Sequence, residues 1–212
     1  MTLKISGPAG ELEASYHSPA QAQNAALLCH PHPSYGGSMH DNVLALTAAA
    51  LDQAGSSETG NDSNWAHLRF NFRGVGESSG TYDDSVGEQD DLVAAWDWLR
   101  AQHNWHTLTL VGYSFGSAMA WSARERCEGL SHLVLIAPPT AAMPFSSAPV
   151  PISSREADPK DAPHIIVGDR DDYCNLDAVP ASASLQVLPG ADHFFSGSAD
   201  LLAHAIAKAL AL

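Results

Sequence analysis

Three residue types that could do chemistry together occur in this chain in the order serine, aspartate, histidine. Ser114 lies at the centre of a Gly-x-Ser-x-Gly motif, and Asp171 and His193 each follow a short apolar run. A serine hydroxyl is a weak nucleophile until a base takes its proton, and histidine suits that task because its pKa lies near neutrality. A carboxylate beside the imidazole holds the correct tautomer and stabilises the charged form. These residues predict acyl-transfer chemistry with Ser114 as nucleophile, His193 as base and Asp171 as the orienting acid.

The residues around Ser114 predict a sharp strand-to-helix turn. The apolar run 108–111 is typical of a buried strand, and residues 117–126 contain no Pro or Gly and favour a helix. In such a turn the serine hydroxyl stands clear of the sheet. Gly112 and Gly116 carry no Cβ, so the strand and the helix can approach closely. The N-terminus of that helix also favours an anionic intermediate beside the serine.

Apolar runs and turn signals alternate along most of the chain. Asp41 or Asn42 is placed to cap the first helix. The alternation from residue 25 onward predicts one doubly wound, mostly parallel sheet with helices on both faces, in a single domain over 1–212. Surface loops are expected at 55–64 and at 140–162, the second with room for a short lid at most. Strands are expected at 3–5, 12–16, 25–29, 67–72, 108–111, 133–137, 165–167 and 185–188, and helices at 43–51, 88–102, 117–126 and 202–209.

Four loops at the carboxyl ends of predicted strands carry the chemistry-bearing residues. In open parallel sheets functional groups gather at this edge, so we expect these loops to meet there. Asp172 is an alternative to Asp171 as the acid, because the two are adjacent. A calcium loop starting at Asp169 is disfavoured, since the glycine that such a loop needs at its sixth position is absent. The glycine-rich loop 73–80 lacks the Gly-Lys-Ser/Thr ending of a phosphate-binding loop.

Composition restricts the partners and the compartment. The 212 residues carry a net charge of -14, which disfavours binding to nucleic acid or to an anionic membrane surface. The three cysteines are far apart and odd in number, so reduced thiols in a cytoplasmic protein are expected. The sequence shows neither a signal peptide nor an apolar run long enough to span a bilayer. We expect a small-molecule acyl substrate as partner and leave a homodimer open.

The chain resembles the α/β-hydrolases, which use the order Ser, Asp, His. The resemblance rests on the Ser114 motif, on residues 73–78, on 168–171 and on 190–193. His-Pro-His-Pro at 30–33, with 69–74, is similar to a small bacterial subgroup that has no large cap. The resemblance implies an α/β-hydrolase fold in which an antiparallel N-terminal hairpin leads into a mostly parallel sheet, with a minimal cap or none. In this superfamily the acid usually lies three residues after the glycine that ends its strand, which selects Asp171.

An oxyanion hole needs two backbone N–H groups. One is expected from Phe115, the residue after the nucleophile, and the other from the loop that follows the strand ending at Cys29. Pro31 stands where the usual pattern has glycine and has no N–H to donate, so alignment to that pattern makes His32 the donor, with Ser34 or Tyr35 as alternatives.

The same loops are expected to line the substrate pocket. His30 and His32 invite a zinc interpretation, but zinc needs a third protein ligand and nothing nearby supplies one, so we expect no metal and no cofactor. The residues expected to line the pocket are His30, Tyr35, Gly36 and Phe194.

The sequence thus predicts a serine hydrolase that cleaves a carboxylic ester or thioester through an acyl-enzyme. A non-catalytic binding protein on the same scaffold is the alternative from another class, and an acyltransferase or peptidase using the same triad is a further one. Because no large cap fits between the late strands, short acyl chains are expected to be preferred.

Overall fold

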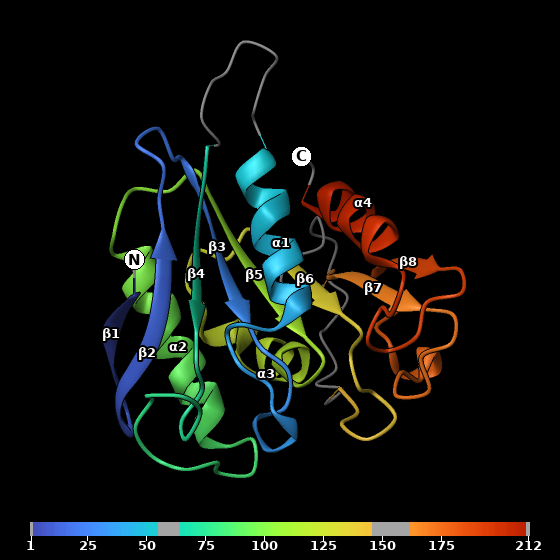
Figure 1. Ribbon diagram of the computed structural model, residues 1–212, viewed down its shortest axis with the longest axis horizontal. Coiled ribbons are helices and arrows are strands. Elements are labelled where there is room, and N and C mark those ends of the chain that lie inside the picture. Colours follow the sequence, from blue (N-terminus) through green and yellow to red (C-terminus); the bar gives the residue numbers. More distant parts are fainter. Residues whose placement is uncertain (1, 55–63, 146–161, 211–212) are drawn as a thin grey trace, which may run out of the picture.

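The computed structural model describes residues 2–54, 64–145 and 162–210. Within these ranges a single sheet of eight strands is flanked by α-helices (Figure 1). The strands are β1 (Thr2–Gly7), β2 (Gly10–His17), β3 (Asn24–Cys29), β4 (Trp65–Phe70), β5 (Thr107–Tyr113), β6 (His132–Ile136), β7 (His164–Gly168) and β8 (Ser184–Leu188). The α-helices are α1 (Asn42–Gln53), α2 (Gly87–Arg100), α3 (Phe115–Ala123) and α4 (Ala199–Ala209).

The strand order in the sheet is β1-β2-β4-β3-β5-β6-β7-β8. β2 pairs antiparallel with both β1 and β4, and every other pairing is parallel. The carboxyl ends of the parallel strands therefore meet along one edge, the lower edge in Figure 1. The α/β-hydrolase fold with its antiparallel N-terminal hairpin is confirmed.

Alternating side chains of the central strands form two cores, one on each face of the sheet. On β3, Leu27 and Cys29 pack into the core covered by α2 and α3, whereas Ala26 and Leu28 pack into the core covered by α1 and α4. Side chains alternate between the two faces of a strand, so a strand that is apolar throughout must be covered on both. This is the doubly wound arrangement that the continuous apolar runs predict.

Local sequence patterns predicted the bounds of most helices and strands to within a few residues. The Asp41 carboxylate accepts a hydrogen bond from the Val43 N–H at 2.8 Å, which confirms it as the cap of α1. The predicted strand 67–72 begins and ends two residues earlier: Trp65 already pairs with β3, and Phe70 is the last residue of β4. In the loop that follows, the Phe72 N–H donates to His30 instead of to a strand.

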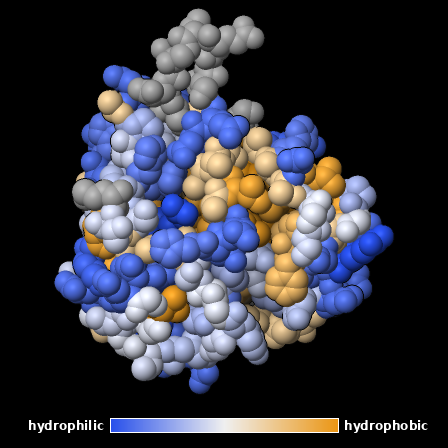
Figure 2. All heavy atoms as spheres, in the orientation of Figure 1, coloured by the Kyte–Doolittle hydropathy of each residue, from blue (hydrophilic) through white to orange (hydrophobic). Residues whose placement is uncertain are grey.

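Helices α1 and α4 pack side by side on the face shown in Figure 2, where apolar side chains gather. Leu46 and Ala50 of α1 are partly buried against the core beneath, and Leu201 of α4 is exposed. The predicted loop at 55–64 and most of the one at 140–162 lie outside the described residues. In the described ranges, no helix is both long and apolar enough to cross a membrane.

Candidate active site

Ser114 occupies a strained turn between β5 and α3. Its φ of 51° and ψ of -118° lie in a region that residues other than glycine rarely adopt. The surrounding structure imposes this conformation, since the Ser114 N–H donates to the Ile136 carbonyl oxygen at 2.9 Å and thereby continues the β5–β6 pairing. A Cβ on Gly112 would lie 2.3 Å from the carbonyl oxygen of Gly116, so the bend leaves no room for a side chain there.

The three predicted residues form one continuous hydrogen-bonded chain. The Ser114 hydroxyl lies 2.9 Å from His193 Nε2, and His193 Nδ1 lies 2.9 Å from each carboxylate oxygen of Asp171. Because a carboxylate can only accept, Nδ1 carries the proton and Nε2 is left to accept from the serine. The Asp171 side chain is fully buried and that of His193 is 8% exposed. The fold thus brings together three residues that are separated by up to 79 positions in the sequence.

The neighbouring aspartates have other surroundings. Asp169 accepts a hydrogen bond from the Gly190 N–H at 2.6 Å and so ties the loop after β7 to the loop after β8. Asp172 is exposed and points to no partner among the described residues. Of the two candidate acids, Asp171 is the one that lies against His193.

Two tyrosines that the sequence analysis missed hold His193 in place. The Tyr113 hydroxyl donates to the His193 carbonyl oxygen at 3.2 Å, and burial raises the pKa of this hydroxyl, so it remains a donor. The Tyr173 N–H donates to Asp171 at 2.9 Å, and its ring lies 4.5 Å from the His193 ring. The signal available in the sequence was the spacing of two residues between Asp171 and Tyr173, at which an aspartate commonly accepts from the backbone ahead of it.

The two N–H groups expected to form an oxyanion hole belong to Phe115 and His32. Within the described part of the chain neither has an acceptor, whereas the N–H of Ser34 donates to His32 Nδ1 and that of Tyr35 to the His32 carbonyl oxygen. The rings of His32 and Phe115 lie 4.9 Å apart, so these two residues are neighbours. Burial lowers the pKa of His32, and the nearby Glu88 carboxylate partly opposes that effect.

His30 does not line a pocket, and that expectation is corrected. It is fully buried, Nδ1 donates to the Pro31 carbonyl oxygen at 2.6 Å, and Nε2 accepts from the Phe72 N–H at 3.1 Å. Burial lowers its pKa to about 4. Both nitrogens of this neutral imidazole are hydrogen-bonded, so His30 links the loop after β3 to the loop after β4.

The other residues expected to line the pocket are at the surface. Tyr35 is 87% exposed with its ring 4.8 Å from that of His32, Gly36 is exposed in a left-handed turn with a φ of 84°, and Phe194 is 64% exposed. The Phe194 ring stands perpendicular to the His193 ring at 5.3 Å. One exposed aromatic side chain thus lies against His32 and the other against the predicted base, His193.

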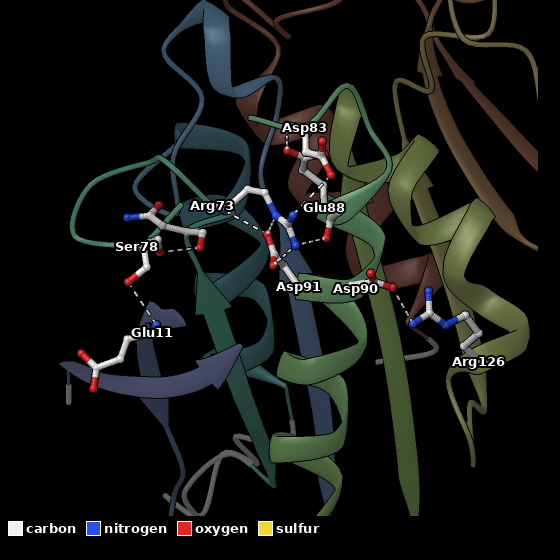
Figure 3. Close-up of polar contacts among 11 residues, drawn as sticks. Glu11, Arg73, Ser78, Asp83, Glu88, Asp90, Asp91 and Arg126 are labelled. Carbon is white, nitrogen blue, oxygen red and sulfur yellow. Dashed lines mark hydrogen bonds and ion pairs between the residues drawn. The ribbon is translucent and has the colours of Figure 1, made fainter. Parts of the chain in front are cut away.

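A buried ion pair holds the loop that follows β4 (Figure 3). Arg73 Nε and Nη2 donate to the two carboxylate oxygens of Asp91 at 2.8 Å each, and Nη2 also donates to the Gly87 carbonyl oxygen. Asp91 is fully buried, and its hydrogen bonds raise the pKa of the Arg73 guanidinium. This pair anchors the loop to α2. The role that the structure gives to the start of the glycine-rich stretch 73–80 is therefore structural. Among the described residues there is no group of three or more His, Cys, Asp or Glu side chains that could hold a metal ion.

Comparisons with known proteins agree with this architecture. The model of the alpha/beta hydrolase fold family matches residues 40–160, more than half of the chain. The uncharacterized protein RP471 of Rickettsia prowazekii (strain Madrid E) is 32% identical over 91% of this chain and 81% of its own length.

Two solved structures are similar to this chain over nearly their whole length. XC6422 from Xanthomonas campestris, described as an α/β serine hydrolase without lid, has a TM-score of 0.82 and 32% identity over 100% of this chain and 93% of its own. An α/β serine hydrolase homologue from Coxiella burnetii has a TM-score of 0.80 and 31% identity over 98% and 96% of the two chains. With the eight-stranded sheet and the turn at Ser114, these similarities show that the chain belongs to the α/β-hydrolase fold family.

Proposed function

We propose that this protein is a serine hydrolase that cleaves a carboxylic ester or thioester through a covalent acyl-enzyme. The observation that carries the proposal is the continuous chain from the Ser114 hydroxyl through His193 to the buried carboxylate of Asp171, with every link at 2.9 Å. That distance lies within the range over which a base can take the proton of a nucleophile.

In the first half of the reaction, Ser114 Oγ attacks the substrate carbonyl carbon and its proton passes to His193 Nε2. The carbonyl oxygen becomes an oxyanion, which the N–H groups of Phe115 and His32 stabilise in this proposal. Asp171 remains ionised and stabilises the imidazolium that forms. His193 then gives the proton to the leaving alcohol or thiol as the carbon–oxygen or carbon–sulfur bond breaks.

In the second half, water replaces the leaving group. His193 takes a proton from the water as it attacks the acyl carbon, and the same N–H groups hold the second oxyanion. Collapse of this intermediate releases the carboxylic acid, and the proton returns to Ser114 Oγ. Strained backbone conformations of this kind are concentrated at active sites, which supports the role proposed for Ser114.

A fluorophosphonate probe tests the proposal, since only an activated serine reacts with it fast. The wild-type protein should be labelled, and Ser114→Ala should not be. Ser131→Ala is the matched control, because Ser131 precedes β6 and so lies at the opposite end of the sheet. Hydrolysis of p-nitrophenyl acetate should fall about 10⁴- to 10⁶-fold in Ser114→Ala.

The same experiment separates the alternatives. A wild-type protein that is neither labelled nor active on esters and thioesters would be a binding protein on this scaffold. Labelling with product transferred to an added alcohol or amine, rather than to water, would identify an acyltransferase. Turnover of peptides in place of esters would identify a peptidase.

A further inference from the structure

The ring of Tyr173 borders the imidazole of His193, and nothing in the mechanism above uses it. Resting on the proposed function, we propose that Tyr173 is a positioning residue whose ring holds the His193 imidazole against Asp171 and stabilises its protonated form during catalysis. Tyr173 acts through His193.

A single residue contacts both the acid and the base of the hydrogen-bonded chain. The Tyr173 N–H donates to Asp171 Oδ1 at 2.9 Å, and its ring centroid lies 4.5 Å from that of His193 with the planes tilted by 41°. The Asp171 carboxylate holds the ring edge of His193 at Nδ1, so the tyrosine ring adds a second constraint that opposes rotation of the imidazole out of line with Ser114.

The distance suits attraction between an aromatic ring and a cation. An aromatic ring attracts a positive charge that lies within about 6 Å of its centroid, and the effect is larger where water is partly excluded. His193 is uncharged until it takes the serine proton, so this attraction is strongest after proton transfer. A group that stabilises the imidazolium more than the imidazole lowers the barrier and leaves the binding of substrate unchanged.

Phe194 provides an internal comparison. Phe194 also lies against His193 and is 64% exposed, compared with 50% for Tyr173. Its ring, however, stands perpendicular to the His193 ring, with the two centroids 5.3 Å apart. Tyr113 lies farther away, at 6.0 Å, and is buried. Of these three aromatic rings around His193, that of Tyr173 therefore lies nearest.

The substitutions at position 173 described next leave every other charged or titratable group near His193 unchanged. These groups are Asp171 and the exposed Arg170 before it, Cys174 near Asp171, the Tyr113 hydroxyl, and Asp192, which accepts from the N–H groups of Phe194 and Ser196. A difference between variants at position 173 thus reports on the ring.

Two substitutions at position 173 separate the ring from the rest of the side chain. Tyr173→Phe keeps the ring and removes the hydroxyl, whereas Tyr173→Leu keeps apolar cover and removes the ring. Both retain the backbone N–H that donates to Asp171. With p-nitrophenyl acetate, Tyr173→Leu should lower kcat about three- to tenfold with KM unchanged, and the acidic limb of kcat/KM should move down by about half a pH unit. Tyr173→Phe should match the wild type in both kcat and the acidic limb, and Phe194→Leu should move the limb less than Tyr173→Leu does, because its ring lies farther from His193.

A titration of His193 followed by NMR makes the test independent of turnover. In Ser114→Ala, adding Tyr173→Leu should lower the midpoint of the His193 titration by about the same half unit, even if the protein hydrolyses nothing. A Tyr173→Leu protein that changes KM alone, with its acidic limb and NMR midpoint unmoved, would overturn the proposal and make Tyr173 a substrate contact. Equal effects of Tyr173→Phe and Tyr173→Leu on kcat and on the acidic limb would assign the role to the hydroxyl, and would also overturn the proposal. Failure of the proposed function shows separately, as absence of fluorophosphonate labelling.

Discussion

The α-carbon of Gly116 lies so close to β3 that a Cβ built on it would be 2.2 Å from the carbonyl oxygen of Cys29. It would also lie 2.7 Å from the carbonyl oxygen of His30. Both neighbours are backbone atoms, which cannot move aside as a side chain can. This contact places the start of α3, and with it the Phe115 N–H, directly beside the loop that carries the His32 N–H.

Gly116→Ala should therefore damage both stability and activity. Overfilling a well-packed site costs about 1–3 kcal/mol, and here the strain falls on the two segments that supply the oxyanion donors. The free energy of unfolding by denaturant and kcat for p-nitrophenyl acetate measure the two effects. Gly36→Asn is the control, since a Cβ on Gly36 meets nothing within 4 Å and asparagine tolerates its left-handed φ. A Gly116→Ala protein as stable and active as Gly36→Asn would contradict the role of this contact.

Asp171→Asn and Asp172→Asn distinguish the two candidate acids. Asp171→Asn should lower kcat about 10⁴-fold, because an amide facing Nδ1 favours the wrong tautomer and leaves Nε2 protonated. Asp172→Asn should stay within about twofold of the wild type, since an exposed carboxylate away from His193 interacts with it only through solvent. Steady-state kinetics of the two variants measure the difference. The reverse order of effects would reassign the acid.

Asp91→Asn and Asp90→Asn compare a buried and an exposed ion pair on adjacent residues (Figure 3). Asp91→Asn leaves the buried Arg73 guanidinium without its buried carboxylate partner, with only the exposed Asp83 at 3.5 Å remaining, and should cost about 3–5 kcal/mol of unfolding free energy. Asp90 pairs with Arg126 at 2.7 Å, but both side chains are 48% exposed, so Asp90→Asn should cost at most about 1 kcal/mol. Urea unfolding of both variants tests this, and equal costs would be incompatible with a structural role for the Arg73–Asp91 pair.

His30 should make the protein less stable in mild acid. Its pKa is about 4 when folded against 6.5 when unfolded, so the unfolded chain binds more protons between these values. The stabilisation is therefore complete above pH 6.5 and is lost as the pH falls toward 4, by roughly 3 kcal/mol in total. Buried His67, whose pKa is also lowered to about 4, adds to the same trend.

His30→Gln isolates this contribution, because glutamine can both donate and accept without titrating. The free energy of unfolding should fall less steeply between pH 7 and pH 5 in His30→Gln than in the wild type. His204→Gln, at an exposed position of α4, should leave the slope unchanged. An identical slope in wild type and His30→Gln would show that His30 is not buried in its neutral form.

Short acyl chains should be better substrates than long ones. Enclosure contributes about 0.8 kcal/mol per buried CH₂, and the aromatic side chains that lie against His32 and His193, Tyr35 and Phe194, are largely exposed. The values of kcat/KM for p-nitrophenyl acetate, butyrate, octanoate and palmitate test this expectation. A steady rise through palmitate would contradict it and indicate an enclosed acyl site.

Patterns within a few residues predicted the fold class and the position of the turn at Ser114. Alternation of apolar runs with helical periodicity defines a doubly wound sheet, because each pattern reflects which faces of one element must be buried. The resemblance to the α/β-hydrolases, through the spacing of Asp171 from Gly168, selected the carboxylate that the fold brings to His193. These signals are local, since the backbone geometry of a strand end or a bend involves only neighbouring residues.

The sequence by itself thus determined the architecture, the serine turn and the candidate acid and base, whereas the tertiary structure decided what surrounds them. His30 became a buried connector instead of a pocket residue because the Phe72 N–H, 42 positions away, needs an acceptor inside the core. The ring of Tyr173 came to lie on His193 because the loops after β7 and β8 converge at one edge of the sheet, and Arg73 came to lie on Asp91 because α2 packs beside the loop after β4. Such contacts depend on how all the strands pack together, and no spacing along the chain encodes them.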